Sequence, residues 1–96
     1  MNLKFEWDPH KAAINLDKHG VSFEEAKTVF QDPLASHFDD QWHSAAERRE
    51  ISIGHSAIHR LLLVYFTERA NQVIRLFSSR LATKKERHDY ETHTHF

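Results

Sequence analysis

The stretch Gln72–Tyr90, with the sequence QVIRLFSSRLATKKERHDY, carries the strongest local signals in this chain of 96 residues. Branched and aromatic side chains dominate its first seven positions, which predicts a strand over residues 72–78 that is buried on at least one face. Residues 83–86 then read TKKE. This is the S/T-x-x-E spacing in which a hydroxyl and a carboxylate satisfy the free amides of a helix start. The stretch therefore predicts a strand, a short turn and a helix.

Five basic residues of this stretch are expected to lie close together where the strand leads into the helix: Arg75, Arg80, Lys84, Lys85 and Arg87. Guanidinium groups, ammonium groups and helix N-termini all present positively polarised N–H donors, so they bind phosphate. The spacing predicts an anion site, and the backbone of a nucleic acid is the favoured ligand. The alternative is that Arg75 pairs with a cross-strand acid such as Glu50, and that the helix cations only solvate a surface helix.

The composition is that of one ordinary globular domain, expected to span residues 1–96. Hydrophobic residues make up 40% and charged residues 28%, so the chain is not of the disordered class. No segment has the ~20 apolar residues of a membrane span, and the first residues show no signal-peptide core. The absence of cysteine excludes disulfides and thiolate ligands, and it is compatible with the reducing cytoplasm, where we expect this protein.

The net charge is −1, but acidic and basic residues are unevenly distributed along the chain. Residues 1–47 contain four lysines against nine acidic residues, whereas residues 48–96 contain nine lysines and arginines against five acidic residues. This asymmetry favours a polyanionic or acidic partner for the second half.

The first half predicts a strand followed by two helices. Residues 3–7 alternate apolar and polar side chains, as a half-buried strand does. Asp8-Pro9 then supplies an N-cap and a first helical residue for a helix that runs to His19 and ends at Gly20. Pro9, Ala13 and Leu16 form one stripe of this helix, with Ala12 beside it, and this stripe is expected to be buried. A second capping box, Ser22 to Glu25, starts the next helix.

Four strands are expected in the remainder, at residues 34–39, 48–55, 61–66 and 72–78, and a last helix follows them. The resulting order is β-αα-ββββ-α. Short connections favour an antiparallel meander for these strands, with residues 61–66 as the central one. The fold class is therefore α+β, with two N-terminal helices packed on one face of a small antiparallel sheet and the last helix elsewhere.

RNA can be cleaved without a metal ion if the protein helps the 2′ hydroxyl attack the adjacent phosphate and stabilises the charge that develops. Arg75 and Arg80 are suited to stabilising that charge. His19 and Tyr90 are candidates for proton transfer, provided the fold brings them near. The alternative for His19 is a polar residue at a helix C-terminus, where the helix dipole favours its cationic form.

A metal site is not indicated, although the chain has nine histidines. His55 and His59 flank an expected turn, His93 and His95 lie near the end of the chain, and neither pair has a third ligand at a diagnostic spacing. We therefore predict no metal and no cofactor.

Many residues, matching in the same order along the chain, resemble the sequence pattern of the BrnT family of bacterial type II toxins. The matching segments are residues 5–9 (FEWDP), Lys11-Ala12, Asn15, residues 18–26 (KHGVSFEEA), Val29-Phe30, Asp32-Pro33, Glu47-Arg48, Gly54, Arg60, Leu62, Ile74-Arg75, Ser78, Arg80, Ala82-Thr83, Glu86-Arg87 and Tyr90. Where most members have Ile-Ser-Ala-Arg before the last helix, this chain has Phe-Ser-Ser-Arg at residues 77–80.

The resemblance implies a RelE-like fold and a ribonuclease that arrests translation. It also implies a BrnA-like ribbon-helix-helix antitoxin as partner, with operator DNA bound only through the toxin–antitoxin complex. The implied catalytic residues are Lys18, His19, Arg75 and Arg80. The residues expected to contact RNA are Arg48, Lys84, Lys85, Arg87 and Tyr90. A non-catalytic module that binds protein or nucleic acid through the same charged surface is the alternative function.

Overall fold

The structure, a computed structural model, describes residues 2–43 and 47–93. These residues form helices, two short 3₁₀ segments and one five-stranded sheet. In chain order the elements are β1 (Lys4–Glu6), α1 (Pro9–His19), α2 (Phe23–Ala26), η1 (Lys27–Gln31), β2 (Ser36–Asp39), β3 (Glu50–His55), β4 (Leu61–Arg69), η2 (Ala70–Gln72), β5 (Val73–Leu81) and α3 (Lys84–His93). The predicted α+β order is confirmed.

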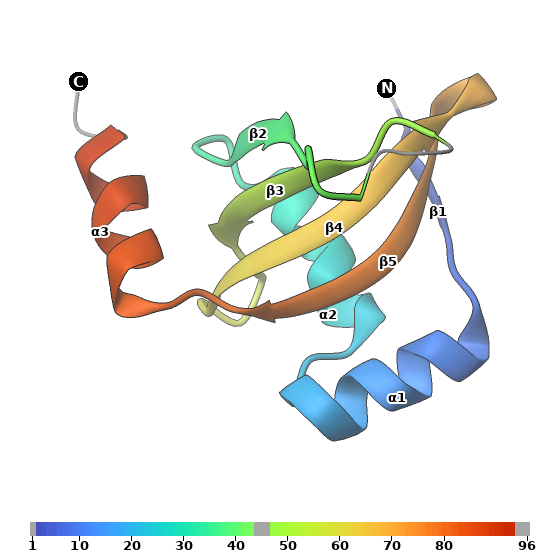
Figure 1. The fold of residues 1–96 in the computed structure, drawn as a ribbon, viewed down its shortest axis with the longest axis horizontal. Coiled ribbons are helices and arrows are strands. Elements are labelled where there is room, and N and C mark those ends of the chain that lie inside the picture. Colours follow the sequence, from blue (N-terminus) through green and yellow to red (C-terminus); the bar gives the residue numbers. More distant parts are fainter. Residues whose placement is uncertain (1, 44–46, 94–96) are drawn as a thin grey trace.

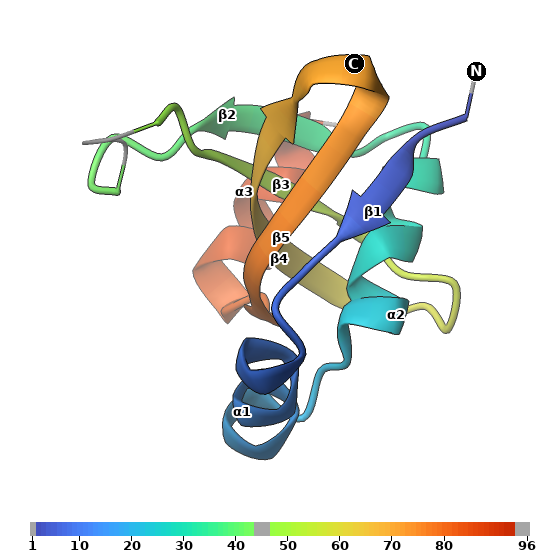
Figure 2. The same ribbon diagram turned by 90° about the vertical axis from the view of Figure 1, so that its right-hand side faces the viewer.

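The strands lie in the order β1-β5-β4-β3-β2. Strands β2 to β5 form the expected antiparallel meander, and β4 is central. β1 extends the sheet by pairing in parallel with β5. Figure 1 shows α3 well apart from α1 and α2, and Figure 2 shows α2 and α3 on opposite sides of the sheet. The last helix therefore packs away from the first two, as predicted.

Each face of the sheet carries its own apolar cluster. On one face β4 and β5 pack against α2 and η1, and the buried residues are Val21, Phe23, Ala26, Val29, Leu62, Val64, Phe66, Ile74 and Leu76. On the other face, Ile53, Leu61 and Leu63 pack with Tyr90 of α3. The Tyr90 hydroxyl donates a hydrogen bond of 2.9 Å to Asp32 Oδ2. Tyr90 thus anchors α3 to the body of the fold.

Side-chain caps start all three predicted helices. Asp8 Oδ1 accepts from His10 N at 2.8 Å, and Ser22 Oγ accepts from Glu25 N at 3.0 Å. At α3, Glu86 N donates to the Thr83 hydroxyl at 3.1 Å, and Thr83 N donates to Glu86 Oε1 at 2.8 Å. The capping box predicted at residues 83–86 is therefore formed reciprocally.

The predicted buried stripe of α1 is wrong. Pro9 and Ala13 are exposed, and Leu16 is 52% exposed. The face that packs instead carries Ala12 and Asn15, and Asn15 is only 5% exposed. The reason is that α1 docks on β5 through the hydrogen bonds of an asparagine, a residue that an apolar pattern does not count.

Candidate active site

A pocket of about 410 Å³ lies between α1, the residues Asp40, His43 and Arg49 that lie between β2 and β3 in the sequence, and the C-terminal half of β5. Its lining residues are Lys11, His19, Asp40, His43, Arg49, Tyr65, Phe77, Ser78, Ser79 and Arg80. Three of them are lysine or arginine and two are histidine, against one carboxylate. The pocket therefore suits an anion.

Arg80 is held in this pocket by α3. Its Nη1 and Nη2 donate to the two carboxylate oxygens of Glu86 at 2.8 and 2.9 Å, and Nη2 also lies 3.4 Å from the Tyr65 hydroxyl. These hydrogen bonds raise the pKa of Arg80 and, despite partial burial, lower the pKa of Glu86 to about 2. The guanidinium thus has a fixed orientation, and its side chain remains 31% exposed.

This pair gives the fold a measurable acid dependence. Because the pKa of Glu86 falls from its usual 4.5 to about 2 on folding, the unfolded chain takes up this proton first as the pH decreases. The contribution of the pair is therefore fully present above pH 4.5 and is lost as the pH falls towards 2. We predict that the stability advantage of the wild type over Glu86→Gln, measured by urea unfolding, shrinks across that interval. An advantage independent of pH would contradict the pairing.

A β-bulge in β5 shapes the pocket. Tyr65 pairs with Ser78 and Phe66 pairs with Leu76, so Phe77 is an extra residue in β5. Such a bulge re-aims the neighbouring side chains. The Arg49 guanidinium lies over the Phe77 ring, with its carbon 3.9 Å from the ring centroid, and Lys11 Nζ lies 5.9 Å from it. Phe77 thereby holds two cations at the pocket by cation–π contact.

The opposite wall is formed by the chain that follows β2. Asp40 is 3% exposed, and its backbone N–H donates to the Arg49 carbonyl at 2.9 Å. Asp40 Oδ2 lies 2.8 Å from His43 Nδ1. A carboxylate in this position fixes the orientation of the imidazole. The pocket therefore contains His19 together with a second, oriented imidazole.

Residues 7–86 match the family model described as the ribonuclease toxin BrnT of type II toxin–antitoxin systems. This chain belongs to the BrnT family. The resemblance noted in the sequence is thereby confirmed. The fold is similar to that in the 1.1 Å crystal structure of the Brucella abortus ribonuclease toxin BrnT, with a TM-score of 0.68. The two chains are 24% identical over 86% of this chain and 100% of that one. A comparison with curated proteins gave no significant match.

Two of the four candidate catalytic residues of this BrnT-family chain, His19 and Arg80, line the pocket. Lys18 is exposed on α1 and is not among the lining residues. Arg75 also lies elsewhere, with Nη1 3.0 Å from Glu6 Oε2. The alternative prediction was that Arg75 pairs with a cross-strand acid such as Glu50. Arg75 does pair with an acid, but that acid is Glu6 on β1. Catalytic roles for Lys18 and Arg75 stay predictions.

The bulge also determines how Arg75 and Arg80 are related. In a regular strand, residues five apart point to opposite faces. Here Arg75 pairs with Thr67 and Arg80 pairs with Leu63, and these two residues of β4 are four apart. Both arginines therefore lie on the same face of the sheet. They are separated by the length of four residues of β4, about 13 Å at the usual rise per residue.

None of the five residues predicted to contact RNA lines the pocket: Arg48, Lys84, Lys85, Arg87 and Tyr90. Arg48 donates to Asp39 through Nε and Nη2 at 3.0 and 2.8 Å, on the exposed surface. The three α3 cations are exposed. Tyr90 is 5% exposed and bonded to Asp32, so its side chain belongs to the core. Tyr90 was also a candidate for proton transfer, but it does not line the pocket proposed as the active site.

Sequence reasoning missed Lys11, Arg49, Tyr65 and His43 as pocket residues. A signal for Lys11 was present, because residues 11 and 19 are eight apart and share one helix face. Arg49 and His43 had no such signal, since both lie outside the helices and strands of the structure. Tyr65 was assigned only to the central strand.

Among residues 2–43 and 47–92, no three His, Cys, Asp or Glu side chains are grouped so as to hold a metal ion. The side chains of His93 and His95, both weighed as ligands, lie outside this range. Every helix in the same part of the chain is too short or too polar to cross a bilayer.

Proposed function

We propose that this BrnT-family chain cleaves RNA at the pocket between α1 and β5, without a metal ion, and thereby arrests translation. The observation that carries the proposal is the gathering of Lys11, Arg49 and Arg80 around His19 in one pocket. Family membership supplies the reaction class, a ribonuclease toxin of a type II toxin–antitoxin system. The pocket supplies the groups that such a reaction requires.

In the proposed reaction the RNA 2′ oxygen attacks the adjacent phosphorus and the bond from phosphorus to the 5′ oxygen breaks. One proton leaves the 2′ hydroxyl and one reaches the departing 5′ oxygen. The products are a 2′,3′-cyclic phosphate and a 5′ hydroxyl. His19 and His43 are the proposed proton-transfer groups, because both line the pocket and an imidazole can accept and donate a proton.

Negative charge grows on the phosphate oxygens during this reaction, and fixed cations stabilise it. Arg80 is oriented by Glu86, and Arg49 lies over Phe77. Both are therefore held in place before RNA arrives, which reduces the reorganisation that the reaction requires. The exposed cations of α3 extend the positive surface along which RNA backbone would lie.

We further propose that the chain acts in the cytoplasm as a single domain of residues 1–96. A BrnA-like antitoxin of the ribbon-helix-helix class would neutralise it, and operator DNA would be bound only through that complex. Membership in a type II system supports the existence of an antitoxin partner.

Expression of the chain alone and beside its antitoxin tests this function. We predict growth arrest only when the chain is expressed alone. The purified chain is expected to cleave single-stranded RNA in the presence of EDTA, leaving 2′,3′-cyclic phosphate ends. Salt-sensitive RNA binding without cleavage, together with normal growth, would support a non-catalytic binding module instead.

A further inference from the structure

We propose that Asn15 is a positioning residue that fixes α1 against β5 and so places Lys11 and His19 in the pocket. The effect of Asn15 on catalysis rests on the proposed function, whereas its effect on the position of α1 does not. Neither the apolar pattern nor the charge pattern of the sequence points to this residue.

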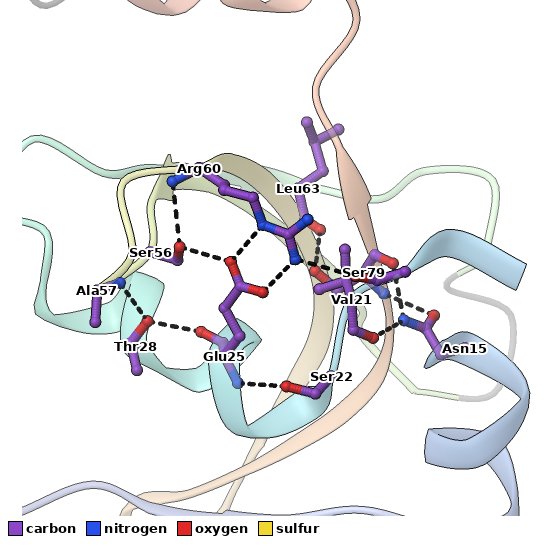
Figure 3. Close-up of polar contacts among 11 residues, drawn as sticks. Asn15, Val21, Ser22, Glu25, Thr28, Ser56, Ala57, Arg60, Leu63 and Ser79 are labelled. Atoms are coloured by element: carbon purple, nitrogen blue, oxygen red, sulfur yellow. Dashed lines mark hydrogen bonds and ion pairs between the residues drawn. The ribbon is translucent and has the colours of Figure 1, made fainter. Parts of the chain in front are cut away.

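Asn15 is buried, and both the nitrogen and the oxygen of its side-chain amide form hydrogen bonds. Nδ2 donates to the carbonyls of Val21 and Ser79, each at 2.9 Å, and Oδ1 accepts from Ser79 N at 3.0 Å. Figure 3 shows this side chain reaching from α1 to the strand that carries Ser79. Ser79 is itself fixed, because its hydroxyl donates to the Leu63 carbonyl at 2.8 Å. The amide thus ties α1 to the residue directly before Arg80.

Because α1 is a helix, fixing Asn15 also fixes the positions of Lys11 and His19 at the pocket. Lys11 and His19 lie four residues before and after Asn15, so both share its helix face, each about 6 Å away along the axis. Both line the pocket, as do Ser79 and Arg80. A shift of α1 along or around its axis would therefore move Lys11 and His19 relative to Arg80.

Apolar packing alone would hold α1 weakly. Ile14 and Leu16 are 51% and 52% exposed, and Ala13 is exposed. A second polar contact holds the end of the helix, where Arg60 Nη2 donates to the Gly20 carbonyl at 3.0 Å. That contact fixes the helix terminus, whereas Asn15 fixes the middle of the helix against β5.

The test compares Asn15→Ala with a double variant, Thr28→Ala with Ser56→Ala. Thr28 accepts from Ala57 N at 2.8 Å and donates to the Glu25 carbonyl at 2.6 Å, and Ser56 donates to Glu25 Oε2 at 2.7 Å. These contacts, also drawn in Figure 3, join η1 and α2 to the turn after β3. Ser56 also accepts from Arg60 N at 3.3 Å. The double variant therefore removes four hydrogen bonds away from the pocket, three of them partly buried and one exposed, whereas Asn15→Ala removes three buried ones.

We expect Asn15→Ala to lower kcat for RNA cleavage by about 10- to 100-fold with little change in KM, since misplacement of reacting groups acts on the chemical step. The double variant is expected to keep kcat close to the wild-type value at a temperature where both proteins are folded. Equal loss of kcat in the two would overturn the proposal, and so would a folded Asn15→Ala variant with normal kcat. If Asn15→Ala does not fold, Asn15→Ser takes its place, because a serine on a helix can satisfy its own hydroxyl.

A second measurement does not depend on cleavage. Amide hydrogen exchange of Ser79 should accelerate in Asn15→Ala, and the NMR resonances of Lys11 and His19 should shift, while both stay unchanged in the double variant. If these changes occur but the wild type does not cleave RNA, the proposed function fails and the positioning role stands. Unchanged exchange and resonances would overturn the positioning role.

Discussion

Replacing Arg80 with alanine is expected to lower the rate of RNA cleavage by about 10²–10³-fold, the usual cost of removing one preorganised donor to a developing charge. Arg80 lines the pocket and is oriented by two hydrogen bonds to Glu86. The measurement is single-turnover cleavage of a short RNA in EDTA. Loss of Arg80 also unpairs Glu86, so circular dichroism and thermal unfolding should confirm that the variant is folded.

Arg75 provides a matched comparison for this prediction. It lies on the same strand, pairs with a glutamate and is 31% exposed, as Arg80 is. It does not line the pocket. The pocket geometry therefore predicts that Arg75→Ala keeps most of the cleavage rate. Equal losses in both variants would favour the broader basic site predicted from the sequence and would contradict a centre confined to this pocket.

Replacing Tyr90 with alanine is expected to lower the free energy of unfolding by about 3–5 kcal/mol, as the loss of a buried aromatic side chain does. Tyr90 is 5% exposed, packs with Ile53, Leu61 and Leu63, and contacts the His55 ring at 5.3 Å between centroids. It is the main apolar contact by which the described part of α3 meets the sheet. Urea unfolding measures this loss.

Tyr90→Phe separates the structural role from the predicted RNA contact. It keeps the ring but removes the hydrogen bond to the Asp32 carboxylate, which should cost about 1.5–3 kcal/mol. RNA cleavage by the folded variant is expected to be unchanged. A large loss of RNA binding with little loss of stability would instead support the contact predicted from the sequence.

The same contact has a pH signature. Burial, together with the hydrogen bond to Asp32, raises the pKa of Tyr90 to about 12. Because the pKa is higher in the folded chain than in the unfolded chain, the contribution of this group is fully present below pH 10 and is lost as the pH rises towards 12. Tyr90→Phe should remove this part of the alkaline instability.

The sequence was sufficient for the helix starts, because a capping box is a local pattern of a few residues that acts wherever it occurs. It was also sufficient for the meander, since short connections leave few alternatives. It could not supply the parallel pairing of β1 with β5, which joins segments about 70 residues apart along the chain. It also misplaced the buried face of α1, because Asn15 is held there by hydrogen bonds and not by hydropathy.

The candidate site was only partly accessible from the sequence, and for a related reason. His19 was predicted as a site residue from its place at the end of the first helix, and Arg80 from its place between the last strand and the last helix. The distinction between Arg75 and Arg80 depends on the bulge at Phe77 and on the acid each arginine meets, neither of which a pattern of residue types specifies. Likewise Arg48 and Arg49 are neighbours in sequence, yet only Arg49 lies against Phe77.

NMR titration with a short single-stranded RNA whose 2′ hydroxyls are methylated tests the central claim most directly, because such an RNA binds without being cleaved. If the pocket between α1 and β5 holds the phosphate, the largest shifts should fall on the resonances of Lys11, His19, Tyr65 and Arg80. These shifts should weaken as salt is added. Shifts concentrated around Glu6 and Arg75, with the pocket resonances unmoved, would contradict the claim.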